Sequence, residues 1–272
     1  MSANPAKKKL TMAEQADKHE LYELSVQNVE HEVEFIQETF QELAGRTAHL
    51  FREDFCGTAS AACEWVKQGK DFQAIGVDID PSVLDWGRKH RVGRLPAEDQ
   101  ARVSLIESDV LTVETPKVDV LAAFNFSYWI FEERRTMVNY MRRCHEALKD
   151  DGVLFLDMFG GPESFEETRE KTKHDGFTYI WHQAEFHPIT NHMKCYIHFK
   201  FPDGSRLKKA FSYEWRLYTA PELRDMLHEA GFSTVTVYWE GEDEDGEGNG
   251  IFTPDAEGEA DLAWIAYIVA QK

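Results

Sequence analysis

Acidic side chains follow three apolar segments of the sequence, each at the point where a buried strand would end. Glu53 opens the run Glu-Asp-Phe-Cys-Gly-Thr-Ala, while Asp78 and Asp109 come directly after two later apolar runs. Gly57, within the first run, lets backbone N–H groups approach a ligand closely at the start of a helix. Asp78 follows roughly 20 residues later, where a carboxylate can accept hydrogen bonds from both hydroxyls of a ribose. The pattern therefore predicts a ribose-containing ligand.

Two observations narrow this prediction. A dinucleotide-binding turn has the pattern Gly-x-Gly-x-x-Gly, whereas residues 55–60 keep only the central glycine, which disfavours a bound pyrophosphate. Asp80, just before Pro81, is the better candidate for capping the next helix, which leaves Asp78 free for a ligand. The alternatives are a turn that only reverses the chain and an Asp78 that only caps a helix.

Strands and helices must alternate to position these acids. Short apolar runs lie at 48–51, 72–77, 103–106, 118–126 and 152–159, and helical patterns separate most of them. Such alternation predicts parallel crossover units and an α/β sheet covered on both faces. The glycine-bearing turn, Asp78 and Asp109 then share the carboxyl edge of the sheet, where open α/β sheets bind ligands.

The pattern differs before and after this region. Apolar residues at helical spacing predict a helix over about 14–45, ended by Gly45. After residue 160 we expect a charged helix to about Lys173, followed by three aromatic-rich runs typical of an antiparallel meander. A helix over 221–230 and two further strands complete the chain, with an acidic loop between those strands.

Four parts are therefore predicted, and their order is helical cap, core, insert and core. Their bounds are an N-terminal helical cap at 1–45, an α/β core at 46–173, an antiparallel insert at 174–216, and the C-terminal part of the core at 217–272 with the acidic loop 240–261.

Composition limits the partners. The formal net charge of −19 repels phosphate backbones and anionic lipid surfaces, so we expect neither a nucleic acid nor a membrane as partner. The four cysteines form no Cys-x-x-Cys pair, and no apolar stretch is long enough to span a membrane. These features favour a cytoplasmic protein.

Taken in order, the motifs resemble those of class I S-adenosylmethionine-dependent methyltransferases. The similarity covers about residues 46–160, through Glu53 to Ala59, Gly76 to Asp78, Glu107 to Val110 and the run 118–126, and continues from Trp215 to Val235. It implies a Rossmann-like, seven-stranded and mostly parallel sheet whose last strand, Leu262 to Ala270, is antiparallel. It also implies S-adenosylmethionine as cofactor and S-adenosylhomocysteine as product.

The resemblance assigns the cofactor contacts. Glu53 takes the place near the methionine amino group, Asp78 the ribose, Ile79 the adenine face, and Asp109 with Val110 the adenine edge. The full set implied is Tyr22, Glu53, Phe55, Gly57, Asp78, Ile79, Asp109, Val110, Asn125 and Phe126. Phe55 and Ala59 replace two glycines of the family pattern, which narrows the freedom of the turn. Tyr22 could equally be a core aromatic residue of an amphipathic helix.

Methyl transfer from a sulfonium requires alignment of donor and acceptor and exclusion of water. A base is needed only where the acceptor enters protonated, and Asp157, a tyrosine or a histidine of the meander could then serve. We name Tyr22, Tyr128, Tyr213 and Arg216 as catalytic candidates. Arg216 could clamp a substrate carboxylate, or it could form a surface salt bridge.

The aromatic insert matches the place of a substrate lid. Its aromatic residues could form a wall that binds a cation or a ring, or could simply be the apolar face of a small sheet: Trp181, Tyr196, Phe199, Tyr213 and Trp215. His182, His192 and His198 share strand parity without the tight spacing of a metal site, and the acidic loop lacks the glutamate that an EF-hand requires. We predict no metal.

These observations predict a methyltransferase for a small metabolite, with an amine or a carboxylate-bearing acceptor favoured. A protein methyltransferase that docks basic partners through the acidic loop is one alternative. A protein that binds S-adenosylmethionine without catalysis is another. A nicotinamide-dependent oxidoreductase is disfavoured by the missing glycines and the antiparallel last strand.

Overall fold

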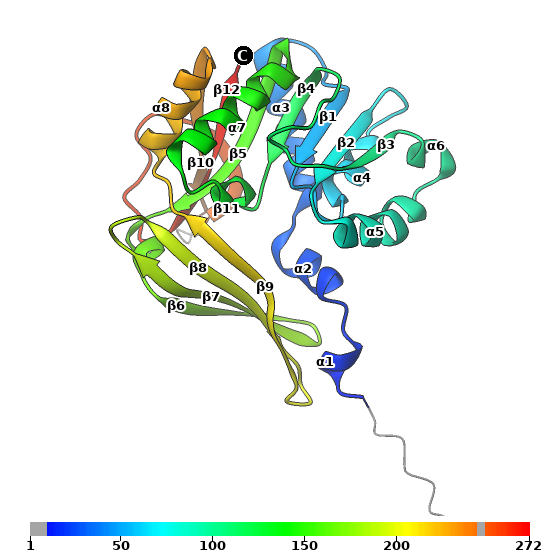
Figure 1. The fold of residues 1–272 in the computed structure, drawn as a ribbon, viewed down its shortest axis with the longest axis vertical. Coiled ribbons are helices and arrows are strands. Elements are labelled where there is room, and N and C mark those ends of the chain that lie inside the picture. Colours follow the sequence, from blue (N-terminus) through cyan, green and yellow to red (C-terminus); the bar gives the residue numbers. More distant parts are fainter. Residues whose placement is uncertain (1–9, 244–247) are drawn as a thin grey trace, which may run out of the picture. The chain divides into compact units, whose positions relative to one another are not determined.

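The computed structural model describes residues 10–243 and 248–272, which divide into two compact units (Figure 1). The core unit comprises residues 28–165 and 216–272. The insert unit comprises the described N-terminal residues 10–27 together with residues 166–215. The N-terminal segment predicted as one cap over 1–45 is thus shared between the two units. Among the described helices, none is both long and apolar enough to cross a membrane.

Eight strands form the sheet of the core unit, in the order β11-β10-β12-β5-β4-β1-β2-β3. The strands β1 to β5 run parallel, and β12 is antiparallel to both β5 and β10. Their bounds are β1 Leu50–Asp54, β2 Gln73–Asp78, β3 Val103–Glu107, β4 Val118–Ala123, β5 Leu148–Gly160, β10 Thr234–Glu242, β11 Gly248–Asp255 and β12 Trp264–Gln271. The predicted Rossmann-like fold class is confirmed, with β11 as an additional edge strand.

Helices cover the sheet of the core unit. They are α3 Val29–Ala44, α4 Ser60–Val66, α5 Pro81–His90, α6 Ala97–Gln100, α7 Arg134–Ala147 and α8 Ala220–Ala230, with short 3-10 turns η1 Val92–Arg94, η2 Ser127–Ile130 and η3 Pro162–Phe165. The first turn of α5 begins as predicted, because the Asp80 carboxylate accepts the Ser82 N–H at 2.8 Å and Pro81 occupies the first helical position.

Strand alternation decides which side chains face α3. Phe51 of β1 and Phe155 of β5 are fully buried in the cluster that includes Val33, Ile36 and Phe40 of α3. Side chains two residues further along a strand lie on the same face. Glu53 and Asp157 therefore face the α3 side of the sheet, near its carboxyl edge.

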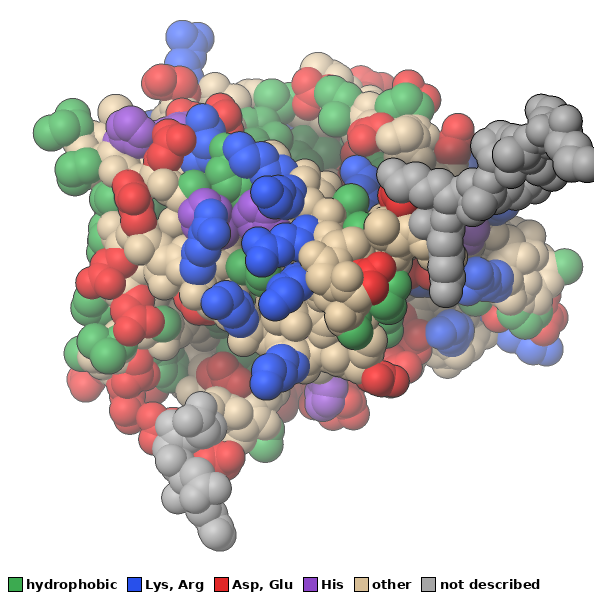
Figure 2. Space-filling model, turned by 90° about the horizontal axis from the view of Figure 1, so that it is seen from below, with side chains coloured by type: hydrophobic (Ala, Val, Ile, Leu, Met, Phe, Trp, Pro, Cys, Tyr) green, Lys and Arg blue, Asp and Glu red, His purple; other side chains and the backbone are tan. Residues whose placement is uncertain are grey.

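The insert unit contains a four-stranded antiparallel sheet in the order β6-β7-β8-β9. Its elements are α1 Met12–Gln15, α2 Lys18–Val26, β6 Thr168–His174, β7 Phe177–His187, β8 His192–Lys200 and β9 Arg206–Arg216. One face packs Ile197 and Phe199 against Leu21 of α2. The opposite face carries basic side chains and histidines, which gather on the surface shown in Figure 2: Arg169, Lys171, Lys173, His182, His198 and Lys200.

Three predictions about secondary structure were wrong. The helix expected over 14–45 is three helices, because Asp17 caps a new helix and residues 16, 17, 27 and 28 leave helical geometry. The charged helix expected up to Lys173 is strand β6, whose residues pair with the aromatic strand β7. Part of the acidic loop 240–261 is strand β11, because Phe252 packs against Phe35 and Tyr267. The predicted loop residues 244–247 lie outside the described residues.

Candidate cofactor-binding site

The turn after β1 alternates between ordinary and left-handed backbone. Phe55, Gly57 and Ala59 have φ of 58°, 52° and 64°. Phe55 and Ala59 thus adopt the conformation that glycine takes most readily, so replacing two glycines does not remove the left-handed turn. Open space surrounds the position that a Cβ would take at Gly57. The turn therefore leaves room beside its backbone, as the resemblance implied.

Asp78 supports this turn from the end of β2. Its Oδ2 accepts the Gly57 N–H at 2.9 Å, and its Oδ1 accepts the Asp80 N–H at 2.9 Å. The side chain is only partly buried, and burial is the main cause that raises its pKa. Each oxygen keeps a further lone pair, so the carboxylate can still accept from the hydroxyls of a ribose.

Glu53, near the end of β1, is a buried acid with an unsatisfied carboxylate oxygen. It is 7% exposed, and no described residue donates a hydrogen bond to its Oε2. Burial, followed by the charges of Glu32, Asp78 and Asp54, raises the pKa of Glu53 well above its usual range. A buried carboxylate oxygen without a donor is costly, so a cationic or N–H-bearing ligand would relieve this group.

The other candidate residues of the carboxyl edge come directly after β2 and β3. Ile79 is 69% exposed directly after β2, where it can cover the face of a planar ring. Asp109 accepts the Leu111 N–H at 2.8 Å, and Val110 is buried behind it. Asp78 and Glu107 are paired in the register of β2 and β3, so the two strands end at the same level of the sheet.

The loop after β4 has its own carboxylate support. Asn125 and Phe126 are both left-handed, with φ of 56° and 57°. Asp157 of β5 accepts their N–H groups, at 2.6 Å from Asn125 and 2.9 Å from Phe126. Burial raises the pKa of Asp157 to about 8, against the lowering effect of these two donors. These two hydrogen bonds hold the Asn125–Phe126 backbone at the same edge of the sheet as Glu53.

Comparison with a protein family decides the nature of this unit. Residues 56–154, which include the turn after β1 and the loop after β4, match the family described as a methyltransferase domain. The chain carries a methyltransferase domain. The prediction of a methyltransferase is thereby confirmed, and S-adenosylmethionine is the methyl donor that such a domain implies. A sequence search of curated proteins found no match.

Solved structures of low sequence identity share the fold over nearly the whole chain. An S-adenosylmethionine-dependent methyltransferase from Clostridium acetobutylicum is 15% identical, covers 93% of this chain and 96% of its own, and has a TM-score of 0.68. The amino pentose methyltransferase CalS10 from Micromonospora echinaspora is 16% identical, with 93% and 95% covered and a TM-score of 0.65. The sugar N-methyltransferase KedS8 from a Streptoalloteichus species is 15% identical, with 100% and 97% covered and a TM-score of 0.63.

Two catalytic candidates have structural roles in the methyltransferase domain. Tyr128 is fully buried, and its hydroxyl donates to the backbone carbonyl of Asp157 at 2.8 Å. Arg216 donates to the Glu132 carbonyl at 3.1 Å and to Glu222 Oε1 at 2.9 Å. Since these bonds hold Tyr128 in the core and Arg216 at the start of α8, neither residue is retained as a catalytic candidate. Arg216 forms the salt bridge that was its alternative.

The side chain of Phe55 packs away from the Glu53 side of the sheet. Its ring lies 6.0 Å from that of Phe131 and 5.9 Å from that of Tyr140 of α7, measured between centroids. The side chain therefore packs on the α7 side of the sheet, opposite to the side that Glu53 faces. A contact of Phe55 with the cofactor remains a prediction, and the packing of the ring leaves the backbone of the turn as the part that could make it.

The insert unit holds the other candidates. The ring of Tyr22 lies 4.9 Å from that of Phe211, and Tyr213 stacks on Trp215 at 4.5 Å. Burial raises the pKa of Tyr213, and a hydrogen bond with Tyr22 opposes this. Both tyrosines thus belong to one aromatic cluster of this unit. Their roles in catalysis and cofactor binding remain predictions.

Four of the five aromatic residues named for the insert lie on one face of its sheet, and Tyr196 does not, while a ligand-binding role for this face remains a prediction. Trp181 lies 6.1 Å from Trp215, and Phe199 is buried on the same face. Tyr196 pairs with His182 on the opposite face, where the Lys209 ammonium lies 4.0 Å from its ring. Residues at alternate positions of β8 face opposite ways, and Tyr196 has the parity of the basic face.

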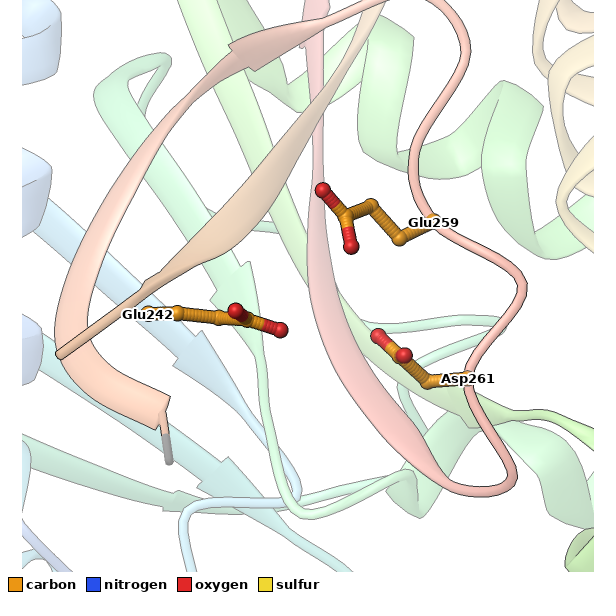
Figure 3. A group of neighbouring side chains, drawn as sticks. All are labelled: Glu242, Glu259 and Asp261. Carbon is orange, nitrogen blue, oxygen red and sulfur yellow. The ribbon is translucent and has the colours of Figure 1, made fainter. Parts of the chain in front are cut away.

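Acidic side chains also gather outside the cofactor edge. Glu242, Glu259 and Asp261 each offer an oxygen, and these atoms lie within 4.8 Å of one another (Figure 3). The first two side chains are exposed to solvent. Exposed acids cluster without an ion in many proteins, and we assign no metal here.

Glu32 and Tyr267 were missed by the sequence analysis. Glu32 lies on α3, and its charge contributes to the raised pKa values of Glu53, Asp157 and Tyr267. Tyr267 of β12 lies directly opposite Asp157. The only signal for Glu32 was its place beside Val33, four residues before Ile36, at the border of the apolar stripe. A single acid at such a border is too common to stand out.

Proposed function

We propose that the chain transfers a methyl group from S-adenosylmethionine to an amino group of a small molecule. The unpartnered Oε2 of buried Glu53 carries the cofactor assignment, because the methionine part of the cofactor has an ammonium group. Asp78 would hold the ribose, and exposed Ile79 would cover the adenine. When bound, the cofactor supplies an electrophilic methyl group on a positively charged sulfur.

The residues present fit this cofactor in three respects. Glu53 offers an acceptor to the ammonium, the Gly57 backbone leaves space beside it, and the Asn125–Phe126 backbone is fixed by Asp157. None of Glu53, Asp78 and Asp157 forms an ion pair with a Lys or Arg among the described residues. An acidic edge of this kind favours a cationic donor and an acceptor that is itself basic.

The amine assignment is supported by the solved structures of the same fold. Their names include an amino pentose methyltransferase and a sugar N-methyltransferase. With 15–16% identity these likenesses concern the fold, so they make an amine the first class of acceptor to test.

Glu53→Gln tests the cofactor assignment through two ligands. S-adenosylmethionine has an amino group, whereas 5′-methylthioadenosine keeps the nucleoside and lacks the amino acid part. We expect Glu53→Gln to weaken binding of S-adenosylmethionine about 10–150-fold, the equivalent of about 1.5–3 kcal/mol for a charged hydrogen bond. Binding of 5′-methylthioadenosine should stay within about twofold of the unaltered protein.

Calorimetric titration measures both affinities, and NADH serves as a third ligand. Equal losses for the two nucleosides would contradict the role of Glu53. Binding of NADH, with no response to S-adenosylmethionine, would overturn the proposed function. Release of S-adenosylhomocysteine in the presence of amines, compared with matched alcohols and with a lysine-rich peptide, then identifies the acceptor class.

A further inference from the structure

A group of polar side chains lies on the α3 side of the carboxyl edge, next to the Glu53 position. Asp157 and Tyr267 are paired partners on β5 and β12. The ring of Tyr267 stacks on Phe35 of α3 at 4.7 Å and meets Phe124, at the end of β4, at 5.4 Å. These contacts place Tyr267 on the face that α3 covers, and Asp157 with it.

Glu32 enters this group from the helix. It lies three residues before Phe35, and residues at this spacing are neighbours on one side of a helix. Phe35 contacts Phe155, Tyr238 and Tyr267, so this side of α3 faces β5, β10 and β12. Glu32 is therefore directed toward the end of the sheet where Glu53, Asp157 and Tyr267 face it.

The group is acidic without a compensating cation. Glu32, Glu53 and Asp157 have no ion pair among the described residues, and Glu53 Oε2 is buried with no donor. The charged or titratable groups that face Glu32 are Glu53 of β1, Asp157 of β5 and Tyr267 of β12, while Glu240 of β10 also acts on Tyr267. One cofactor ammonium at Glu53 leaves Glu32 and Asp157 without a cationic partner among the described residues.

We propose that Glu32 is the base that takes the proton from an ammonium acceptor, with Tyr267 and Asp157 lining the place where the amine is held. This inference rests on the proposed function. Asp157 is already engaged by the Asn125 and Phe126 N–H groups, so it positions the loop and contributes charge. The Glu32 carboxylate has a backbone hydrogen bond with Asn28 and no side-chain donor among the described residues, so it keeps lone pairs that can receive a proton.

The ammonium acceptor gives one proton to the Glu32 carboxylate, which leaves a neutral amine with a lone pair. The lone pair forms the N–C bond to the methyl carbon as the C–S bond breaks, and the bonding electron pair stays on sulfur. The methylated product is again an ammonium, and Glu32 releases its proton to solvent.

Burial raises the pKa of Glu32 to about 7, which suits this role near neutral pH. Glu32 must be ionised to act. We therefore expect kcat/KM to rise with pH up to about 7, and to fall about tenfold for each pH unit below it.

Direct titration of Glu32 tests the proposal without turnover. In protein labelled with carboxyl-¹³C glutamate and saturated with S-adenosylhomocysteine, Glu32→Gln identifies the Glu32 signal by its loss. We expect methylammonium chloride to lower the titration midpoint of Glu32 by about 1 pH unit or more, compared with sodium chloride at the same concentration. A cation within hydrogen-bond reach stabilises the ionised carboxylate relative to the protonated acid. A midpoint that methylammonium does not move would overturn the proposal.

Kinetics give the second measurement. On an amine acceptor, Glu32→Gln should lower kcat about 100-fold or more and remove the pH dependence near 7. The affinity for S-adenosylmethionine should fall far less than kcat, because Glu32 acts on the Glu53 position only through its charge. Glu34→Gln, the same change at an exposed position of α3, should leave kcat and the pH profile unaltered. An unchanged kcat in Glu32→Gln would refute the base role. Failure of the proposed function would be a different result: the unaltered protein would show no heat of binding when it is titrated with S-adenosylmethionine in the calorimeter.

Discussion

The two edges of the core sheet hold acids in opposite electrostatic states. At the amino edge, Asp119 at the start of β4 accepts from Arg46 at 2.7 Å and from Lys149 at 2.8 Å. It also accepts the His49 and Leu50 N–H groups. Burial alone would raise the pKa of Asp119, but these donors outweigh it and lower the pKa to about 2.

At the carboxyl edge, burial dominates for Glu53, Asp78 and Asp157, because none of the three pairs with a Lys or Arg among the described residues. The pKa values of Glu53, Asp78 and Asp157 are all raised, chiefly by burial. An acid that the protein pairs with its own cations stabilises the fold. An acid that is buried without one destabilises the free protein and is stabilised by a cationic ligand. The same residue type thus serves folding at one edge and, in our proposal, binding at the other.

Asp119→Ala should produce the largest effect on stability. It leaves two backbone N–H groups without their acceptor, while the partly exposed Arg46 and Lys149 can still be hydrated. We expect the free energy of unfolding to fall by about 2–4 kcal/mol, measured by urea denaturation near pH 7. S-adenosylmethionine affinity should be unchanged.

The pKa of Asp119 is lowered in the folded state, so its contribution is present above its ordinary pKa near 4 and is lost as pH falls toward 2. The stability difference between the unaltered protein and Asp119→Asn should therefore shrink below pH 4. A difference that is constant from pH 7 to pH 3 would contradict the ion-pair account.

Asp78→Ala, in contrast to Asp119→Ala, should act mainly on cofactor binding. We expect a loss of cofactor affinity of about 1–3 kcal/mol, because a partly buried acceptor for the ribose is removed. The loss should be equal for S-adenosylmethionine and 5′-methylthioadenosine, unlike the selective loss expected for Glu53→Gln. Calorimetry measures both. Asp78→Asn, which keeps one acceptor oxygen, should lose less. Unchanged affinity in Asp78→Ala would remove Asp78 from the ribose site.

Local sequence patterns predicted the sheet because each strand carries its own signal. The apolar runs of β1 to β5 and the acids Glu53, Asp78 and Asp109 that follow them needed no knowledge of distant residues. Strand β6 was mistaken for a helix because its charged residues lie in a two-layer unit where only the neighbour β7 supplies the apolar pattern. Strand β11 was missed for a similar reason, since Phe252 is its principal contact with the core.

Residues that act through distant partners could not be predicted in this way. Tyr128 was a reasonable catalytic candidate by position, but a hydrogen bond to a strand 29 residues away holds it in the core. For Arg216 a substrate carboxylate and a surface salt bridge both stayed open, because its partner Glu222 could not be distinguished by sequence from any other surface acid. Glu32 depends on three strands that the sequence places far from it.

Gly57→Ala, compared with Gly45→Ala, separates strain from binding and should have the smallest effect on stability. Both glycines are left-handed, with φ of 52° and 68°, and an added Cβ at either would have no neighbour within 4 Å. Each substitution should lower the free energy of unfolding by about 1–2 kcal/mol, since L residues are disfavoured in this conformation. Only Gly57→Ala should also weaken S-adenosylmethionine binding, because its Cβ enters the space beside the turn. Equal affinity in the two variants would show that the cofactor does not approach the Gly57 backbone.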